Sequence, residues 1–449
     1  MSTQPPGPQD LPVLGNTHRY SRDPFTFIET LTRSYNGLAT FTLGSESTYL
    51  VTDPTDIERV LVSEASRFRK AQTMRTGSID DLLGDGLLMS GGEFWRRQRQ
   101  RAQPAFAPGR VANFGEEIAG YAETMLDGWN EGNVVAIDPA MARITVKVIV
   151  SVMFGTELDD PTTETVQNNL EPLGKMFEPK AAQFLLPEWV PTRERIEFER
   201  AVDNLEGVLD SLVRQRRGTE DGEMDLLSIL LRAQGEVDEV TDELVRDELM
   251  TMLLAGHDTT ALSLTYTWYL LAQHPEIERR VHDEIDDVLG GEPPTADDVR
   301  DLDLTERVIQ EAMRLYPPVY TIFREPSEDV RLGGYDVPEG SLVMLPQWGV
   351  HRDPRWYDDP ETFDPDRWTS DRASNRPNYS YFPFGGGPRH CIGKHLSMLE
   401  AQMILATVAQ NYRLRLAPEQ SAELDFAPSL TMHPSEPIRM EVQERERTR

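Results

Sequence analysis

The chain's only cysteine lies in a glycine-rich stretch, Tyr381-Phe-Pro-Phe384-Gly-Gly-Gly387-Pro-Arg389-His-Cys391-Ile-Gly393. Apolar residues follow at helical spacing, so we expect a helix over about residues 394–410 with the thiol at its N-terminus. Backbone N–H groups at a helix N-terminus and a nearby arginine favour thiolate over thiol. The glycines allow the backbone to approach a large, flat group closely. These features indicate that Cys391 is a ligand rather than an inert core residue.

Two other interpretations of this stretch stay open at this point. A phosphate-binding loop would have Ser or Thr after its lysine, which Gly393-Lys394-His395 lacks. A zinc site is suggested by His390, Cys391 and His395, but no second cysteine or paired histidine stands at a familiar ligand spacing. The pattern therefore favours a ligand to a flat cofactor over both.

The composition indicates a globular, acidic protein. The 449 residues include 76 Asp and Glu against 45 Lys and Arg, a formal net charge of −31, which disfavours nucleic acid as a partner. Acid excess with few lysines is typical of proteins from halophilic organisms, although ordinary acidic cytosolic proteins share it. There is no signal-peptide pattern, no apolar run long enough to span a membrane and no second cysteine for a disulfide. We therefore expect a cytoplasmic protein, and a monomer.

Apolar periodicity predicts a mainly α-helical chain with a smaller β-rich lobe. Four long segments have helical spacing: residues 116–153, 198–233, 242–272 and 275–289. Alternating residues predict a hairpin over 38–52 and short strands over 330–332, 335–337 and 341–345. The β-rich lobe is thus expected from about residues 35–55 and 320–350. Without internal repeats or a flexible linker, residues 1–449 are expected to form one domain.

The spacing Phe384-x-x-Gly387-x-Arg389-x-Cys391-x-Gly393 resembles the haem-binding signature of the cytochrome P450 monooxygenases. The resemblance implies a cytochrome P450 fold in which haem b lies between a long central helix and the cysteine stretch. Cys391 would be the thiolate ligand of the iron, Phe384 would pack beside its sulfur, and Arg389 would bind a haem propionate. Thiolate ligation favours O–O cleavage, which explains a cysteine rather than a histidine at this position.

A polar interruption, Ala255-Gly-His-Asp-Thr-Thr260, lies within an apolar helix expected over residues 249–271. Taken alone, it is a tolerated weak spot, because a threonine hydroxyl can bond the carbonyl one turn back and bend the helix. By the resemblance, Ala255 and Gly256 make room for oxygen over the haem. Thr259 would hydrogen-bond the oxygen and Asp258 would relay protons to it. We expect His257 on the helix surface.

Further motifs match the family. Glu311 and Arg314, one helical turn apart, resemble two members of its buried Glu/Arg/Arg network, and Arg367 in the stretch 363–368 resembles the third. This network would support the cysteine stretch. By the resemblance, three more residues contact the haem propionates: Trp95, Arg99 and Arg324. In isolation, the same patterns also fit a surface ion pair and a cation–π pair.

Residues 94–115 contain five arginines and no acid, although the whole chain is acidic. Haem carboxylates alone would need only two of them. We expect Arg96, Arg97 or Arg101 to form a positive face on the cysteine side of the haem, where an acidic electron donor such as a ferredoxin docks.

The segments that would cover the haem are apolar, which favours a bulky hydrocarbon substrate. The expected wall residues are Leu82, Leu87, Phe184, Val319, Ile322 and Phe323. We therefore expect a monooxygenase that hydroxylates a fatty acid, carotenoid or other isoprenoid with dioxygen. About 58 residues follow Cys391, too few for a fused reductase, so electrons would come from separate proteins.

Two alternatives to this function are a peroxide-driven peroxygenase of the same fold and a non-catalytic haem carrier. Asp258 and Thr259 argue against the first, because a peroxygenase does not need a proton relay. The arginine-rich stretch argues against the second. The sequence identifies neither the substrate nor a role for His390.

Overall fold

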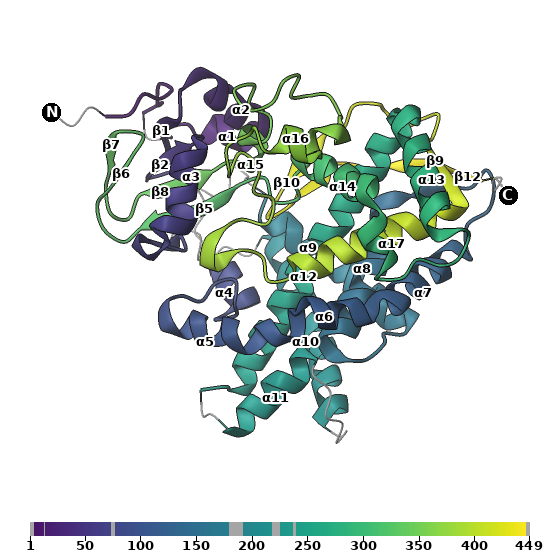
Figure 1. Cartoon of the computed structure of the whole chain (residues 1–449). Helices are drawn as coiled ribbons and strands as arrows, with labels where there is room; N and C mark the ends of the chain where they lie inside the picture. Colours follow the sequence, from purple (N-terminus) through teal and green to yellow (C-terminus); the bar gives the residue numbers. More distant parts are fainter. Residues whose placement is uncertain are drawn as a thin grey trace.

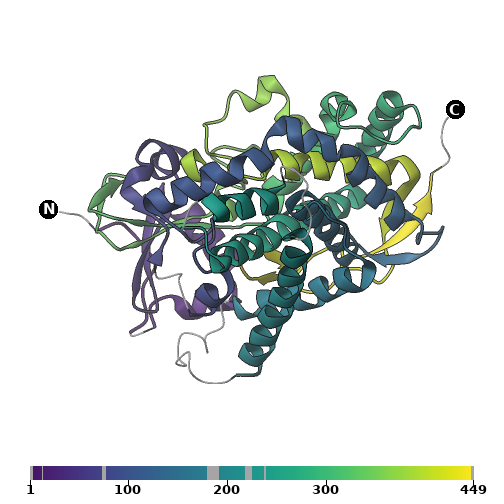
Figure 2. The ribbon, with the colours of Figure 1, turned by 90° about the horizontal axis from the view of Figure 1, so that it is seen from below.

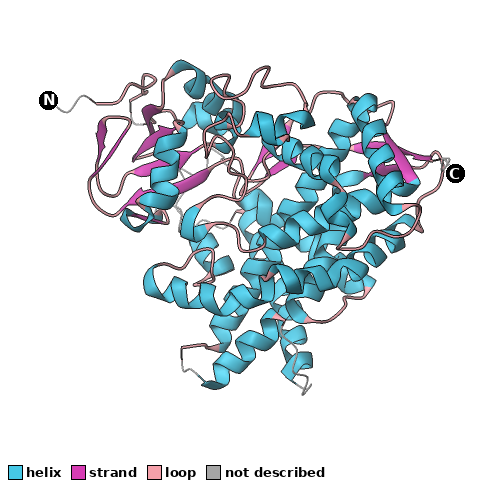
Figure 3. Cartoon of the chain, in the orientation of Figure 1, coloured by secondary structure: helices cyan, strands magenta, loops and turns pink. Residues whose placement is uncertain are grey.

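The structure is a computed structural model that describes residues 4–12, 14–72, 77–178, 192–217, 225–236 and 239–445. Helices dominate it, and most strands lie on two sides of the molecule, one near the N-terminus and the other near the C-terminus (Figure 1, Figure 3). The helices of the first half are α1 Thr17–Arg22, α2 Pro24–Ser34, α3 Pro54–Glu58, α4 Gly77–Leu83, α5 Gly92–Ala102, α6 Pro108–Val111, α7 Gly115–Leu126, α8 Ile137–Phe154, α9 Asp160–Met176 and α10 Arg193–Arg217. Those of the second half are α11 Leu226–Glu236, α12 Asp242–Gln273, α13 Pro275–Leu289, α14 Asp303–Leu315, α15 Gln347–Val350, α16 Ser370–Ala373 and α17 Lys394–Asn411.

Two segments with continuous helical spacing are each divided in the structure. Residues 116–153 contain α7 and α8, separated by β4 (Val134–Ala136), because the polar stretch before β4 turns the chain at Gly132, whose φ is +78°. Residues 198–233 contain most of α10 and α11. The segments expected at 275–289 and 394–410 form α13 and α17 almost to the residue.

The central helix α12 runs through the middle of the molecule (Figure 2). It begins where the Thr241 hydroxyl accepts a hydrogen bond from the backbone N–H of Leu244 at 3.1 Å. Most of its residues are buried around the whole circumference, as expected for a helix enclosed by other helices. Gly256 is required by the crossing with α8, because a Cβ there would lie 2.5 Å from Ile149 Cδ1.

The largest sheet joins segments far apart in the sequence, in the order β1-β2-β8-β5-β3. Its parallel pair β2–β8 places Tyr49 opposite Val343, and the antiparallel pair β5–β8 places Phe323 opposite Met344. The bounds of its strands are β1 Leu38–Leu43, β2 Glu46–Val51, β3 Phe68–Arg69, β5 Ile322–Pro326 and β8 Leu342–Leu345. This sheet therefore carries residues 322–326, which include the expected haem contact Arg324, against the edge of the helical body.

Within the described residues, three smaller sheets complete the β structure. Their strands are β6 Val330–Leu332 with β7 Tyr335–Val337, β10 Phe426–Pro428 with β11 Met432–Pro434, and β4 with β9 Tyr412–Leu416 and β12 Arg439–Glu444. In the described part of the chain, no helix has the length and apolarity that crossing a membrane requires.

Candidate active site

The cysteine loop, residues 381–393, is held by backbone contacts that only glycine allows. Gly387 has a φ of +62°, and a Cβ at this position would lie 1.9 Å from the carbonyl oxygen of Leu61 in the π-helical turn Arg59–Ser63. Gly393, in contrast, has an ordinary φ and only van der Waals contacts near its α-carbon. The backbone N–H of Cys391 donates to the carbonyl of Phe384 at 2.9 Å. Gly387 thus packs the loop against the protein, and the Cys391–Phe384 bond closes it.

The Cys391 side chain faces space that water can enter, three residues before α17 begins. The protein atoms packed around the sulfur still desolvate it and so raise the pKa of its thiol, and the backbone N–H of Gly393 together with the charges of Arg99 and Lys394 only partly offsets that effect. The backbone N–H and the arginine that the sequence predicted to favour the thiolate are thus present, but burial has the larger effect on the pKa. A bound metal ion would reverse the balance, because a coordinating thiol loses its proton. Among the described residues, no group of three His, Cys, Asp or Glu side chains could hold a metal, so zinc finds no support.

The polar segment of α12 lies close to the start of α17. The Thr260 hydroxyl donates to Ser397 Oγ at 3.0 Å and so ties the two helices together. Ala255, one turn and a half earlier, is exposed although most of α12 is buried. Ala255 and Cys391 are therefore both accessible and both lie near the contact between α12 and α17. A site between α12 and the cysteine loop requires such an arrangement.

The expected acid and alcohol occupy adjacent positions on α12 but bond in different directions. The Thr259 hydroxyl donates to the carbonyl of Ala255 at 3.0 Å. The Asp258 carboxylate contacts the hairpin β10–β11, where it accepts a hydrogen bond from the Thr431 hydroxyl at 2.6 Å. His257 is buried, at 3% exposure, and the surface position expected for it is wrong. Because α12 is enclosed on all sides, it has no solvent face for this residue.

Four cations gather near the cysteine loop without a carboxylate partner among the described residues: Lys70, Arg99, Arg324 and Arg389. Burial, together with the charge of a neighbouring arginine, lowers the pKa values of Arg324 and Arg389 to about 10. Burial also lowers the pKa of Lys70, again with Arg324 and Arg389 contributing. Arg324 is buried and the other three are half-buried, and like charges held together without an anion repel one another, so this cation cluster fits a dianionic group such as the two propionates of haem.

Trp95 and Arg99 belong to this cluster through different partners. The guanidinium of Arg389 lies 4.3 Å from the centre of the buried Trp95 ring, so the cation–π pair is with Arg389 rather than with Arg99. Arg99 Nη2 lies 3.3 Å from His390 Nε2, and His390 Nδ1 lies 2.9 Å from the carbonyl of Gly387. The carbonyl requires a proton on Nδ1, which leaves Nε2 to accept from Arg99. His390 therefore orients Arg99 toward the site.

The structure brings Glu311, Arg314 and Arg367 together in the protein interior. Arg314 donates to both oxygens of Glu311 at 2.8 Å, and Arg367 Nε lies 3.3 Å from Glu311 Oε1. The Arg314 and Glu311 side chains are fully buried. Arg314 also donates to the carbonyls of His351 and Pro360 at 2.9 and 2.7 Å. These bonds fix the irregular segment that leads to the cysteine loop.

The expected substrate-wall residues occupy different environments. Leu82 and Leu87 are buried in the main hydrophobic core, whereas the neighbouring Leu88 is 40% exposed. Val319, Ile322 and Phe323 are half-buried between α14 and β5 or within β5. Phe184 lies outside the described residues.

The three arginines expected on the donor face form ion pairs with acids outside residues 94–115. Arg96 pairs with Glu93, and both Arg97 and Arg101 pair with Glu239. The Arg96 and Arg97 side chains remain 61% and 47% exposed. The charge of this surface is thus partly compensated, which a count along the sequence could not reveal.

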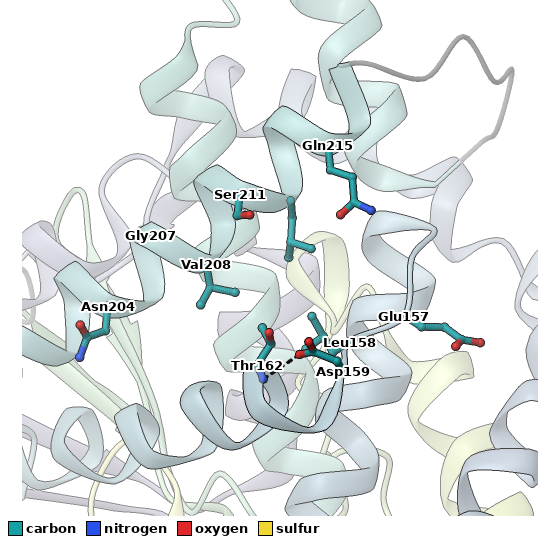
Figure 4. A pocket seen from close by; sticks show the side chains of 10 residues that line it. Glu157, Leu158, Asp159, Thr162, Asn204, Gly207, Val208, Ser211 and Gln215 are labelled. Atoms are coloured by element: carbon teal, nitrogen blue, oxygen red, sulfur yellow. Dashed lines mark hydrogen bonds between the residues drawn. The ribbon is translucent and has the colours of Figure 1, made fainter.

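A pocket of about 510 Å³ between α9 and α10 is separate from the cysteine site (Figure 4). Its lining residues include Glu157, Asp159, Thr162, Asn204, Ser211 and Gln215. Asp159 caps α9 by accepting from the backbone N–H of Thr162 at 2.9 Å. The polar lining and the lack of any residue discussed above exclude this pocket from the haem site.

Comparisons with known proteins agree with this geometry. The family model described as Cytochrome P450 matches residues 5–442. Cyclooctat-9-en-7-ol 5-monooxygenase of Streptomyces melanosporofaciens is 34% identical, over 92% of this chain and 89% of its own. Pentalenene oxygenase of Streptomyces avermitilis is 30% identical, over 92% and 91%. The crystal structure of the cytochrome P450DA heme domain is 27% identical, with a TM-score of 0.87 over 99% of both chains.

Proposed function

Because the chain belongs to the cytochrome P450 family and is a haem monooxygenase, we propose that it hydroxylates a cyclic or extended isoprenoid with electrons from separate redox proteins. One observation carries the proposal. The accessible thiol of Cys391 lies near the α12 segment that presents an acid and an alcohol side by side, Asp258 and Thr259. A thiolate ligand suits dioxygen cleavage, and an acid–alcohol pair suits the proton delivery that cleavage requires.

The residues present fit haem b. Cys391 would supply the axial ligand, and Lys70, Arg99, Arg324 and Arg389 would neutralise the two propionates, which are the anions that the cation cluster lacks. When bound, haem supplies dioxygen activation, which no amino-acid side chain can provide. The Glu311 network would keep the cysteine loop rigid, so that the thiol keeps one position.

This chain's own residues hold and move protons and exclude water. The Thr259 hydroxyl is a donor already placed on the accessible side of α12, although it now bonds the Ala255 carbonyl. Asp258 keeps a carboxylate one residue away, fixed by Thr431. Buried residues keep water from the other sides of α12, and a substrate bound on the accessible side would keep it from Thr259 Oγ1, so that protons reach this oxygen through fixed groups rather than from bulk solvent.

Two supports favour an isoprenoid over other hydrophobic substrates. Relatives of this chain bear the names Cyclooctat-9-en-7-ol 5-monooxygenase, Pentalenene oxygenase and LUTEIN DEFICIENT 5, the last from Arabidopsis thaliana and 29% identical over 92% of this chain. The wall residues Val319, Ile322 and Phe323 are apolar and only half-buried, so they retain surface for a hydrocarbon. Leu88 belongs with them, because it is exposed whereas Leu82 and Leu87 serve the core.

The electron donor is an acidic ferredoxin that docks over α5. Arg96 and Arg97 keep enough exposed surface to exchange Glu93 and Glu239 for carboxylates of a partner. Reversing both charges should slow reduction and weaken its salt dependence. The exposed Arg193 on α10, changed to Glu, is the control for net charge. Equal reduction rates in all three proteins would refute this docking site.

The acidic composition and the single cysteine support a monomeric enzyme of a halophilic cytoplasm. Sedimentation and urea unfolding across a range of KCl concentrations test this part. Unfolding that is as easy in molar salt as in dilute buffer would contradict the halophilic assignment.

Turnover separates the proposal from its alternatives. The haem-loaded protein is offered pentalenene, β-carotene or lauric acid, each with NADPH, a ferredoxin and its reductase, with hydrogen peroxide, or with neither. We expect a hydroxylated terpenoid product only with the donor proteins. Product with peroxide alone would indicate a peroxygenase, and binding without product in every arm would indicate a carrier.

A further inference from the structure

Two side chains, those of Thr431 and His433, meet at one oxygen atom of Asp258. Thr431 Oγ1 lies 2.6 Å from Asp258 Oδ2, and His433 Nε2 lies 3.2 Å from the same oxygen. Thr431 Oγ1 and His433 Nε2 are 3.1 Å apart, which closes a triangle. Thr431 and His433 belong to the hairpin β10–β11, 173 or more residues away in the sequence. The expected proton-relay acid is thus attached to a second element, the hairpin.

The triangle determines where the protons lie. A hydroxyl has one proton, and the 2.6 Å separation assigns the proton of Thr431 to its bond with Asp258. His433 Nε2 approaches two oxygens, so it must carry a proton itself. The imidazole therefore points an N–H group at the Asp258 carboxylate and can give that proton to it.

The hairpin does not depend on His433 for its position. The Tyr266 hydroxyl donates to the carbonyl of the fully buried Met432 at 2.6 Å, and the Met432 N–H donates to the carbonyl of Pro318 at 2.9 Å. The Ser429 hydroxyl donates to the carbonyl of Gly174 in α9 at 2.7 Å. These bonds hold the hairpin from both sides. A substitution of His433 should therefore leave the backbone in place.

The surrounding charges keep Asp258 ionised. Burial alone would raise the pKa of its carboxyl, but the charge of His433 and the hydrogen bonds from His433 and Thr431 lower it below its usual range. Burial lowers the pKa of His257, whose Nδ1 lies 2.7 Å from the carbonyl of Leu253, so His257 stays neutral. A carboxylate held in its ionised form stores no proton at neutral pH. It needs a donor that is refilled from solvent.

Among the described residues, Asp138 and Tyr266 are two further titratable groups that act on this cluster. Asp138, in the first turn of α8, has a pKa raised by burial and feels the charge of His433. Tyr266 of α12 has a pKa raised well above its usual value by burial, and Asp258 adds to this effect. The Tyr266 phenol therefore holds its proton near pH 7. The His433 side chain, by contrast, is 40% exposed, compared with 20% for Asp258, so it is the member of the cluster most open to solvent.

We propose that His433 is a positioning residue for proton delivery, which holds the Asp258 carboxylate on the hairpin and recharges it with a proton from solvent. The inference rests on the proposed function of Asp258 and Thr259. The imidazolium passes its Nε2 proton to Asp258 Oδ2 and becomes neutral imidazole, which takes a new proton from water. Protonated Asp258 loses its attraction to the imidazole, and its side chain turns to pass the proton to Thr259 Oγ1. The Thr259 hydroxyl at the same time gives its own proton to the reduced oxygen that the cofactor site would hold, and Asp258 is a carboxylate again. Imidazole suits this task because its ordinary pKa lies near physiological pH.

The first test is direct and does not depend on turnover. NMR of the haem-loaded protein with labelled histidine gives the pH at which the His433 ring titrates, with His433→Gln to assign the signal. We expect the titration to move to lower pH in Asp258→Asn, because the variant removes the carboxylate that stabilises the imidazolium. An unchanged titration would overturn the proposal, since the two groups would then not be coupled.

The second test follows protons during turnover, with pentalenene as the probe, a ferredoxin and its reductase. His433→Gln keeps an N–H donor for Asp258 but cannot release its proton. We expect the rate of dioxygen consumption to fall about tenfold, with the dissociation constant for pentalenene unchanged. In the wild type this rate should decrease at alkaline pH, where His433 loses its proton, and in the variant that decrease should be absent. His18→Gln, an exposed histidine of α1, is the matched control.

The outcomes distinguish this inference from the function on which it rests. If Asp258→Asn and Thr259→Ala release hydrogen peroxide instead of product while His433→Gln matches the wild type, the role of His433 is refuted and the relay stands. If neither Asp258→Asn nor Thr259→Ala alters the peroxide released per dioxygen, the relay fails, and the role of His433 fails with it.

Discussion

Glu248, near the start of α12, should make the protein less stable as the pH rises. Its carboxyl is 2% exposed and accepts the backbone N–H of Leu87 at 3.1 Å. Burial, with a smaller contribution from Asp247, raises its pKa from 4.5 to about 7. The folded protein therefore binds a proton between these pH values that the unfolded chain has released. Stability is fully retained below about pH 4.5 and falls by about 1.4 kcal/mol per pH unit up to about pH 7, a total of about 3 kcal/mol.

Glu248→Gln should remove this dependence, because the amide keeps an acceptor for the Leu87 N–H but carries no charge. Near pH 5, the variant and the wild type should unfold at similar urea concentrations. At pH 8, the variant should be more stable by about 3 kcal/mol. Equilibrium urea unfolding, followed by circular dichroism from pH 5 to 8.5, measures the difference, in which all other titrating groups cancel.

Glu239→Gln is the control for this experiment. Its ion pairs with Arg97 and Arg101 lower the pKa of Glu239, so its charge stays constant over the range and the effect of its removal should be level. If the free energy of unfolding of Glu248→Gln also differs from that of the wild type by a constant amount from pH 5 to 8.5, the raised pKa of Glu248 is refuted. Glu248 holds the backbone beside Leu88, so the same titration should loosen one wall of the substrate site.

Three further predictions concern the site and its loop. Thr259→Ala, which removes the hydroxyl now bonded to Ala255, should let dioxygen consumption continue while hydrogen peroxide replaces product, and product per NADPH measures the loss; undiminished coupling would contradict the relay. Arg324→Gln should make the apoprotein more resistant to urea, because it relieves repulsion among the clustered cations. The same variant should lose haem to apomyoglobin about tenfold faster, because one partner of the propionates is gone. A variant that is either stabilised in both assays or destabilised in both would contradict the propionate role. Gly387→Ala should destabilise the protein more than Gly334→Ala, because both residues have positive φ but only the Cβ at 387 would strike a backbone oxygen, and equal unfolding midpoints would disprove that contact.

Features encoded by short spacings could be predicted from the sequence. The cysteine loop, the helix that follows it, and the pairing of Glu311 with Arg314 depend on residues within one or two turns of each other. The helices α12, α13 and α17 could also be predicted, because their helical spacing is a local property of the sequence. The break within residues 116–153 was missed, because apolar residues keep a helical period on both sides of the polar residues that precede β4.

Contacts between distant segments could not be predicted in this way. Lys70 was missed as a member of the cation cluster, although it is one of only five lysines, because Arg324 and Arg389 reach it through the fold. The partnership of Asp258 with His433 likewise depends on how the C-terminal hairpin packs on α12. The burial of His257 follows from neighbours on every side of α12, which the helix's own sequence does not reveal.

Roles inferred for individual residues also depended on neighbours. Gly256 was expected to make room for oxygen, and this stays a prediction; the structure adds that its missing side chain admits Ile149 of α8. The arginine-rich stretch looked uncompensated because its acids, Glu93 and Glu239, lie outside it. In each case the residue type was informative, and the partner that defines its role came from another element.

The central claim is that Cys391 binds haem iron as a thiolate. The absorption spectrum of the reduced protein with carbon monoxide, recorded in high salt, tests it most directly. Thiolate ligation predicts a strongly red-shifted Soret band, which Cys391→Ser should abolish while the protein stays folded. A Soret band at the position typical of histidine ligation, or a folded protein that takes up no haem when it is offered, would contradict the claim.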